Sequence, residues 1–226
     1  MVERPNGLVL LKYLVYRVAP KHAALEFRPM IFTLCPRGSS RLLFDKTPLP
    51  RMAKLEISVM PPLIGSPSIG STNARNIFRY ARLADQLGFN AILLQDHIGI
   101  EGAETYDCLT TLGAVAAITR RIRVGTLATP LPLRHPAFVA KAMATVDRIS
   151  SGRAILTVGA GWVKDDFQWY GLRYEGFRTR VKMMEEGVRL IKACWRDGKA
   201  DFQGNFFKLS KADPQPKPVQ RPRPPI

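Results

Sequence analysis

The hydrophobic positions after residue 54 follow two alternating patterns. Short runs of apolar residues predict strands buried on both faces, and apolar residues spaced by three and four predict helices that bury one face. The expected strands span residues 55–60, 91–95, 122–128 and 154–158, and the expected helices span 73–86, 107–119 and 136–149. Because each strand is followed by a helix across a short connection, the order predicts an α/β fold with a parallel sheet.

The ends of these elements carry residues that commonly start and stop helices. Thr72 or Asn73 is expected to cap the first helix, and Gly88 follows its end, where glycine tolerates a positive φ. Asp107 is expected to cap the second helix, and Pro136 suits the first turn of the third. These local signals support the predicted helix boundaries.

The pattern continues with a long helix and a hairpin. Residues 176–195 are expected to form the helix, and residues 201–209 a hairpin that turns around Gly204. The expected buried stripe of the helix consists of Val181, Met184, Val188, Ile191 and Trp195. From Pro214 onward the chain is rich in proline, and another strand is expected to begin at 224–226.

Residues 1–51 differ from the remainder of the chain. They are basic, poor in acidic residues and interrupted by prolines, so we expect a poorly ordered N-terminal extension followed by one domain at 52–226. Because Met52 directly precedes a predicted strand, a translation start upstream of the natural one is the favoured explanation of this segment. A targeting peptide is the alternative, because such peptides are also basic and poor in acids.

Composition raises the question of an acidic partner. The chain has 226 residues, of which 46% are hydrophobic and 23% charged, and its formal net charge is +16. The basic residues are scattered and form no stripe interleaved with aromatics, so specific nucleic-acid binding is not expected, whereas adhesion to polyanions at low salt is. Apolar runs fall short of the roughly 20 residues that cross a bilayer, so no membrane partner is expected.

The cysteines give information about the compartment. Cys35, Cys108 and Cys194 lie far apart and lack the paired spacing of a metal site. An odd number of separated thiols fits a reducing environment. We therefore expect a cytoplasmic protein without a bound metal.

The candidate chemistry lies at the end of the second strand. Asp96 and His97 follow the apolar run at 91–95, and parallel folds place their chemistry at the carboxyl ends of the strands. A carboxylate beside an imidazole suits general acid/base work near neutral pH. The alternative is a solvated loop, or a histidine that caps a neighbouring helix.

Several pieces of sequence, taken together, resemble the luciferase-like monooxygenase family. Members of this family are flavin- or deazaflavin-dependent oxidoreductases with a (β/α)8 TIM-barrel fold. The pieces occur in the family's order and spacing over about residues 54–226, and they are 84–90, 96–97, 116–126, 134–136, 147–153, 158–162, 202–204 and 218–222. As structure, His135 reads as a helix cap, and 148–153 as a turn in which Gly152 takes a positive φ.

The resemblance implies roles for the residues at the strand ends. The family's cofactor lies over the carboxyl ends of the strands, which would make His97 the general acid/base. Asp96 would contact the ring edge or orient a neighbour. The segment Thr126, Leu127 and Ala128 would back the ring, with a non-proline cis peptide near Leu127 and Ala128.

The strand at 154–158 is followed by two glycines and an aromatic residue. By the same resemblance, Gly159 and Gly161 would let the cofactor lie close to the backbone. Trp162 would either wall the pocket or cover the mouth of the barrel.

The cofactor implied by the resemblance is reduced FMN or the deazaflavin coenzyme F420. The choice decides the reaction, because a deazaflavin favours hydride transfer and FMN also activates oxygen. The expected activity is therefore that of a monooxygenase or a hydride-transfer dehydrogenase or reductase, acting on a small organic substrate.

The length of the predicted domain limits this expectation. A complete barrel takes about 250 residues, so residues 52–226 are expected to hold the first four to five β/α units, ending after the start of strand five. The alternative function is therefore a catalytically inactive barrel fragment that pairs with another chain, either a second copy or a complementing subunit.

Overall fold

The computed structural model describes residues 56–61, 64–65, 73–101 and 103–226. The predictions for residues 1–51 lie outside the described residues. The helices of the described part are too short or too polar to cross a membrane.

A four-stranded parallel sheet forms the centre of the fold. The strand order is β1-β3-β5-β7, so each new strand is added beside the previous one. The strands are β1 (Ser58–Val59), β3 (Ala91–Leu94), β5 (Arg123–Thr126) and β7 (Ala154–Ile155). The parallel α/β fold predicted from the apolar runs is confirmed, although the strands are shorter than the runs.

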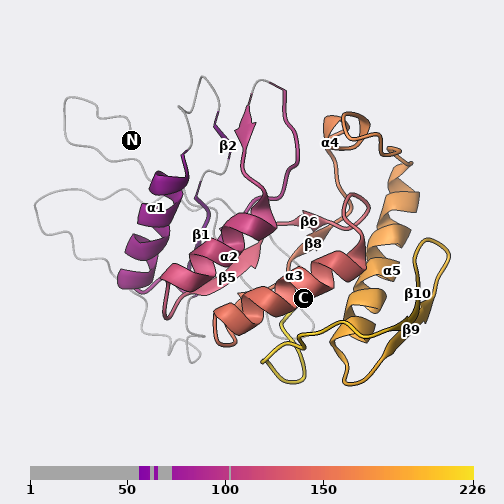
Figure 1. The fold of residues 1–226 in the computed structure, drawn as a ribbon. Helices are drawn as coiled ribbons and strands as arrows, with labels where there is room; N and C mark the ends of the chain where they lie inside the picture. The colour runs from indigo at the N-terminus through magenta and orange to yellow at the C-terminus, as the bar shows by residue number, and fades with distance from the viewer. Residues whose placement is uncertain (1–55, 62–63, 66–72, 102) are drawn as a thin grey trace, which may run out of the picture. The chain divides into compact units, whose positions relative to one another are not determined.

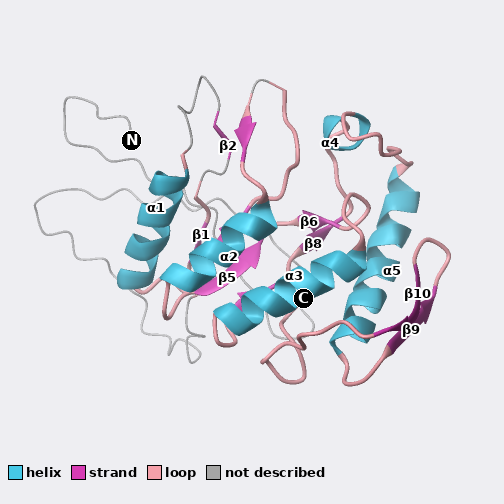
Figure 2. Cartoon of the chain, viewed as in Figure 1, coloured by secondary structure: helices cyan, strands magenta, loops and turns pink. Residues whose placement is uncertain are grey.

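Four helices form a layer over one face of this sheet (Figures 1 and 2). Neighbouring helices of the layer contact each other, with α2 against β5 and α3 against β7. The helices are α1 (Ala74–Gln86), α2 (Cys108–Ile118), α3 (Pro136–Ile149) and α5 (Phe177–Trp195). The core between the layers includes Ile92, Leu94, Leu112, Val115, Met143 and Leu190.

The predicted caps are present. The side chains of Asn73 and Asp107 each accept a hydrogen bond, at 2.8 Å, from the amide three residues ahead. His135 caps α3 by accepting from the Ala137 amide at 3.3 Å. Gly88 and Gly152 have φ values of 79° and 86°. Helix starts and turns are thus set by residues adjacent in sequence.

Two pairs of short strands and one short helix were not predicted. The sequence at 122–130 divides into β5 and β6 (Thr129–Pro130), and β6 pairs in parallel with β8 (Val158–Gly159). β2 (Ile64–Gly65) pairs with β4 (Glu104–Thr105), and α4 (Asp165–Gln168) follows β8. These elements are too short for a hydrophobic period to reveal them.

The predicted buried stripe of α5 is partly wrong. Ile191 and Trp195 are buried, but Val181, Met184 and Val188 are only half-buried. The buried positions also include Arg180, Glu186, Gly187, Leu190 and Cys194. The reason is that α5 packs against α3 and also against the hairpin that follows it, so a second, more polar face is covered.

The hairpin is held to α5 by Glu186. It consists of β9 (Ala200–Gln203) and β10 (Lys208–Ala212). The Glu186 carboxylate accepts hydrogen bonds from the amides of Asn205, Phe206 and Phe207 at 2.7 to 2.9 Å. A side chain on Gly204 would overlap this carboxylate, which is why a glycine fits the turn.

The proline-rich C-terminal segment is anchored by hydrogen bonds. The Asp147 carboxylate accepts from the amides of Val219 and Gln220 at 2.7 and 3.0 Å. The amide of Leu156 donates to the carbonyl of Pro225 at 3.0 Å. This contact puts the last residues beside the end of β7, but residues 224–226, where another strand was expected to begin, form no strand.

Replacing Glu186 with Gln is expected to destabilise the domain by about 1–3 kcal/mol at pH 7. The three amides would then bind a neutral amide group, and hydrogen bonds to a neutral acceptor are weaker than those to a carboxylate. Burial disfavours the ionised form of Glu186, but the three amides outweigh it and hold its pKa below the ordinary 4.5. As the pH falls through that ordinary value, the unfolded chain takes up the proton first and the stabilisation is lost.

Urea unfolding at pH 7 and at pH 4 measures this effect. The difference in free energy of unfolding between the wild type and Glu186→Gln should be smaller at pH 4 than at pH 7. Glu185→Gln is the matched control, because Glu185 is the exposed neighbour. A loss of stability in Glu186→Gln that is no larger than in the control would contradict the assignment.

Candidate active site

The predicted site residues lie at the carboxyl ends of neighbouring strands. Leu94 at the end of β3 lies opposite Thr126 at the end of β5. Pro130 lies opposite Gly159, so the continuations of β5 and β7 also run side by side. The residues that follow these strands therefore meet at one edge of the sheet, the carboxyl edge.

His97 stands at this edge with one ring nitrogen engaged. Its Nδ1 lies 2.7 Å from an Asp166 carboxylate oxygen, and its side chain retains 15% exposure. Its ring contacts Trp162 edge to face, with ring centroids 6.0 Å apart. Two residues predicted from the strand ends, His97 and Trp162, are thus in contact, and Trp162 is exposed.

Asp96 is turned away from solvent into an ion pair. Arg134 Nε donates to both carboxylate oxygens of Asp96, at 3.2 and 3.1 Å, and Arg134 Nη2 donates to Oδ1 at 2.8 Å. The same Nη2 donates to Asp107, the cap of α2, at 2.6 Å. Burial raises the pKa of Asp96, and Arg134 opposes this rise. In these contacts the Asp96 carboxylate orients Arg134.

The segment after β5 contains the predicted cis peptide. The peptide bond between Leu127 and Ala128 is cis. Thr126 is buried, and its hydroxyl donates to the Thr157 carbonyl at 2.8 Å and accepts from the Thr157 amide at 3.1 Å. Its side chain therefore joins two strands, whereas Leu127 and Ala128 are half-buried at the edge.

The two glycines of the next segment differ in their surroundings. A Cβ on Gly161, which has a φ of 73°, would lie 2.8 Å from the Phe167 ring, so glycine is required there by packing. A Cβ on Gly159 would make an ordinary contact of 3.5 Å with the Ala128 Cβ. Gly159 thus lies against Ala128 at the carboxyl edge.

Three residues outside the prediction hold this edge together. Asp166 binds His97, and Arg134 binds Asp96. Arg180 donates to the carbonyls of residues 160 and 161, and its guanidinium lies 4.0 Å from the Tyr174 ring centroid. Arg134 directly precedes the predicted helix cap His135. Its positive charge did not indicate that it would pair with Asp96. Asp166 and Arg180 gave no local signal, because their partners lie far away in sequence.

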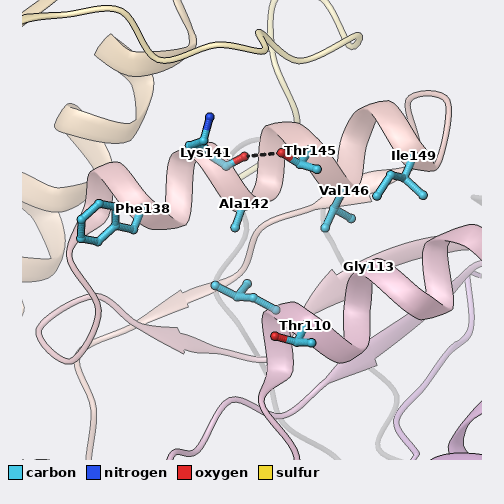
Figure 3. A pocket seen from close by; sticks show the side chains of 9 residues that line it. Thr110, Gly113, Phe138, Lys141, Ala142, Thr145, Val146 and Ile149 are labelled. Carbon is cyan, nitrogen blue, oxygen red and sulfur yellow. Dashed lines mark hydrogen bonds between the residues drawn. The ribbon is translucent and has the colours of Figure 1, made fainter.

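A groove elsewhere on the molecule lies between α2 and α3 (Figure 3). It is mainly apolar, and the Thr145 hydroxyl on its rim donates to the Lys141 carbonyl at 3.0 Å. Its lining residues are Leu109, Thr110, Gly113, Phe138, Lys141, Ala142, Thr145, Val146 and Ile149. This set contains none of the predicted site residues.

Replacing Arg134 with Met is expected to destabilise the domain by about 3–5 kcal/mol, because it leaves the buried Asp96 carboxylate unpaired. Asp96→Asn in the same chain should restore part of that loss. Chemical denaturation at pH 7 measures both effects. Arg79→Met, on the exposed face of α1, is the control. Equal losses in Arg134→Met and the control would refute the structural role of the ion pair.

Two named relatives are similar in sequence to this part of the chain. One is an F420-dependent glucose-6-phosphate dehydrogenase from Amycolatopsis mediterranei, 31% identical over 65% of this chain and 45% of the relative. The other is an FMNH2-dependent dimethylsulfone monooxygenase from Pseudomonas putida, 31% identical over 66% of this chain and 41% of the relative. The chain therefore spans less than half the length of these curated relatives.

Solved structures agree with the sequence matches. The monooxygenase RslO1 from Streptomyces bottropensis superposes with a TM-score of 0.62 at 30% identity, over 71% of this chain and 49% of that chain. An F420-dependent secondary alcohol dehydrogenase shares the fold, with a TM-score of 0.65 at 24% identity, over 74% of this chain and 50% of that one. The family model described as luciferase-like monooxygenase matches residues 56–226, and the chain belongs to that family.

Proposed function

We propose that this protein is an oxidoreductase that uses reduced FMN or the deazaflavin F420 on a small organic substrate at the carboxyl edge. The observation that carries the proposal is His97, a partly exposed imidazole held by Asp166 and bordered by Trp162. Relatives named for either cofactor support both options. The reaction is accordingly a monooxygenation or a hydride transfer.

The residues at the carboxyl edge fit a planar ring. Ala128 and Gly159 lie against each other, both are half-buried, and neither carries a bulky side chain. We assign Leu127, Ala128 and Gly159 to the ring floor, with Trp162 at its border and Gly161 shaping the turn behind it. When bound, the reduced ring would supply the hydride or activate oxygen.

His97 supplies the acid/base function in this proposal. Its Nδ1 is engaged by Asp166, so Nε2 is the ring nitrogen left to give or take a proton. Asp96 contributes indirectly, because its pairing with Arg134 fixes the residue that precedes His97 in the chain. We also infer a reducing, cytoplasmic setting, which is supported by the buried free thiols Cys108 and Cys194.

A second candidate is a subunit that completes its barrel against another chain. The observation that favours it is the open parallel sheet of the described residues, in which β1 and β7 are the outer strands. The partner would be a second copy or a complementing chain. In size-exclusion chromatography, an apparent mass near twice that of the monomer, together with no cofactor binding, would favour this candidate over the enzyme.

Anaerobic titration with reduced FMN and reduced F420 is expected to show saturable binding of one of them, with a spectral change of the ring. The relatives' names supply the first turnover probes, which are dimethyl sulfone for FMN and glucose 6-phosphate for F420. Failure of both cofactors to bind to the monomer and to any oligomer would refute the proposed function.

Replacing His97 with Asn is expected to lower turnover by about 10²–10⁴-fold, the usual contribution of a general acid/base. Cofactor affinity should change much less, because the ring floor is made by other residues. His135→Asn is the matched control, since asparagine retains the capping of α3. Full turnover in an active preparation of His97→Asn would eliminate the assigned role.

A further inference from the structure

The short helix α4 lies against the loop that carries His97. Its residue Asp166 is 3% exposed, and its carboxylate makes three hydrogen bonds to that loop. The partners are His97 Nδ1 at 2.7 Å and the amides of Ile98 and Gly99, which donate at 2.8 and 2.9 Å. One buried carboxylate therefore fixes both the imidazole and the backbone that follows it.

The contact between α4 and the loop is reinforced by the two aromatic residues that follow α4. The Tyr170 hydroxyl donates to the Ile98 carbonyl at 2.9 Å. A Cβ on Gly99 would lie 2.8 Å from the Trp169 ring and 3.3 Å from the Tyr170 ring, so a glycine allows the aromatic residues to approach. The loop and the segment after β8 thus form one packed unit.

The hydrogen bond to Asp166 determines which nitrogen of His97 carries the proton. An ionised carboxylate only accepts hydrogen bonds. One Asp166 oxygen accepts from the amides of Ile98 and Gly99, and the other oxygen faces His97 Nδ1. His97 Nδ1 must then be the donor, and in the neutral ring Nε2 keeps its lone pair. The ring is thereby set to accept a proton at Nε2.

We propose that Asp166 is a positioning residue that holds His97 in the Nδ1–H tautomer and points the Nε2 lone pair at the substrate. This inference rests on the proposed function for its catalytic consequence, but its structural part is measurable on the protein alone. Asp166 acts through His97 and has no contact with substrate in this role.

Nitrogen NMR of the histidine rings tests the tautomer directly, in ¹⁵N-labelled full-length protein at about pH 8.5, where an ordinary imidazole is neutral. The chain has three histidines, and loss of one signal in His97→Gln assigns the ring of interest. Wild-type protein is expected to show a protonated Nδ1. A protonated Nε2 with a bare Nδ1 in the wild type would overturn the proposal.

Asp166→Asn is the informative variant. An amide oxygen can still accept from Ile98 and Gly99, but the amide NH2 turned toward His97 is a donor, so the tautomer should change to Nε2–H. Turnover with the active probe should fall by about 10²–10⁴-fold at unchanged cofactor affinity. Asp165→Asn removes the same charge one residue away and should alter neither property. Asp166→Glu should restore the Nδ1–H tautomer and part of the turnover.

The outcomes separate this inference from the proposed function. A changed tautomer in Asp166→Asn supports positioning by Asp166, and if wild-type protein neither binds cofactor nor turns over either probe, the proposed function alone fails. If Asp166→Asn keeps the wild-type tautomer and turnover, Asp166 has no positioning role. If Asp166→Asn fails to fold, the tautomer of His97 in the wild type and in Asp166→Glu still tests whether Asp166 positions the imidazole.

Discussion

The ion pair between Arg134 and Asp96 joins parts of the molecule that are separate along the chain. It connects the end of β3 to the segment before α3, and through Asp107 it reaches the start of α2. A buried carboxylate without such a partner is costly, so the pair constrains the carboxyl edge where the strands end. Because His97 directly follows Asp96, the position of the imidazole depends on this constraint as well as on Asp166.

Carboxylates that bind backbone amides fix several other connections. Asp85 accepts from the amides of residues 120, 121 and 122, and Asp147 holds the C-terminal segment in the same way. Glu186 holds the hairpin. The side chain of Arg153 complements them by donating to three acceptors at the end of α2, which are the Thr119 hydroxyl and the carbonyls of residues 116 and 119. The family-like pieces that hold Asp85, Asp147 and Arg153 therefore serve architecture, which leaves few residues at the carboxyl edge as candidates for chemistry.

Interactions between residues close together in the sequence could be predicted, whereas those between residues far apart in the sequence could not. The caps at Asn73 and Asp107 were predictable because each binds an amide three residues ahead. The strand ends were predictable from apolar runs, and these placed Asp96 and His97 at the carboxyl edge, where they lie. Asp166 was not, since it lies 69 residues from His97 in a helix of four residues. Glu186 likewise broke the apolar pattern of α5 because its partners are in the later hairpin. The cofactor contacts of Thr126, Gly159 and Gly161 stay predictions.

The edge-to-face contact between Trp162 and His97 makes the indole an optical reporter for this site. Trp162 is 77% exposed and its ring touches the imidazole, so a change at His97 alters the surroundings of the fluorophore. Trp195 is buried at the end of α5 and donates to the Ala140 carbonyl, whereas Trp169 packs against Gly99 in the loop after His97. The difference between the emission of the protein and that of Trp162→Phe therefore isolates the indole that touches His97.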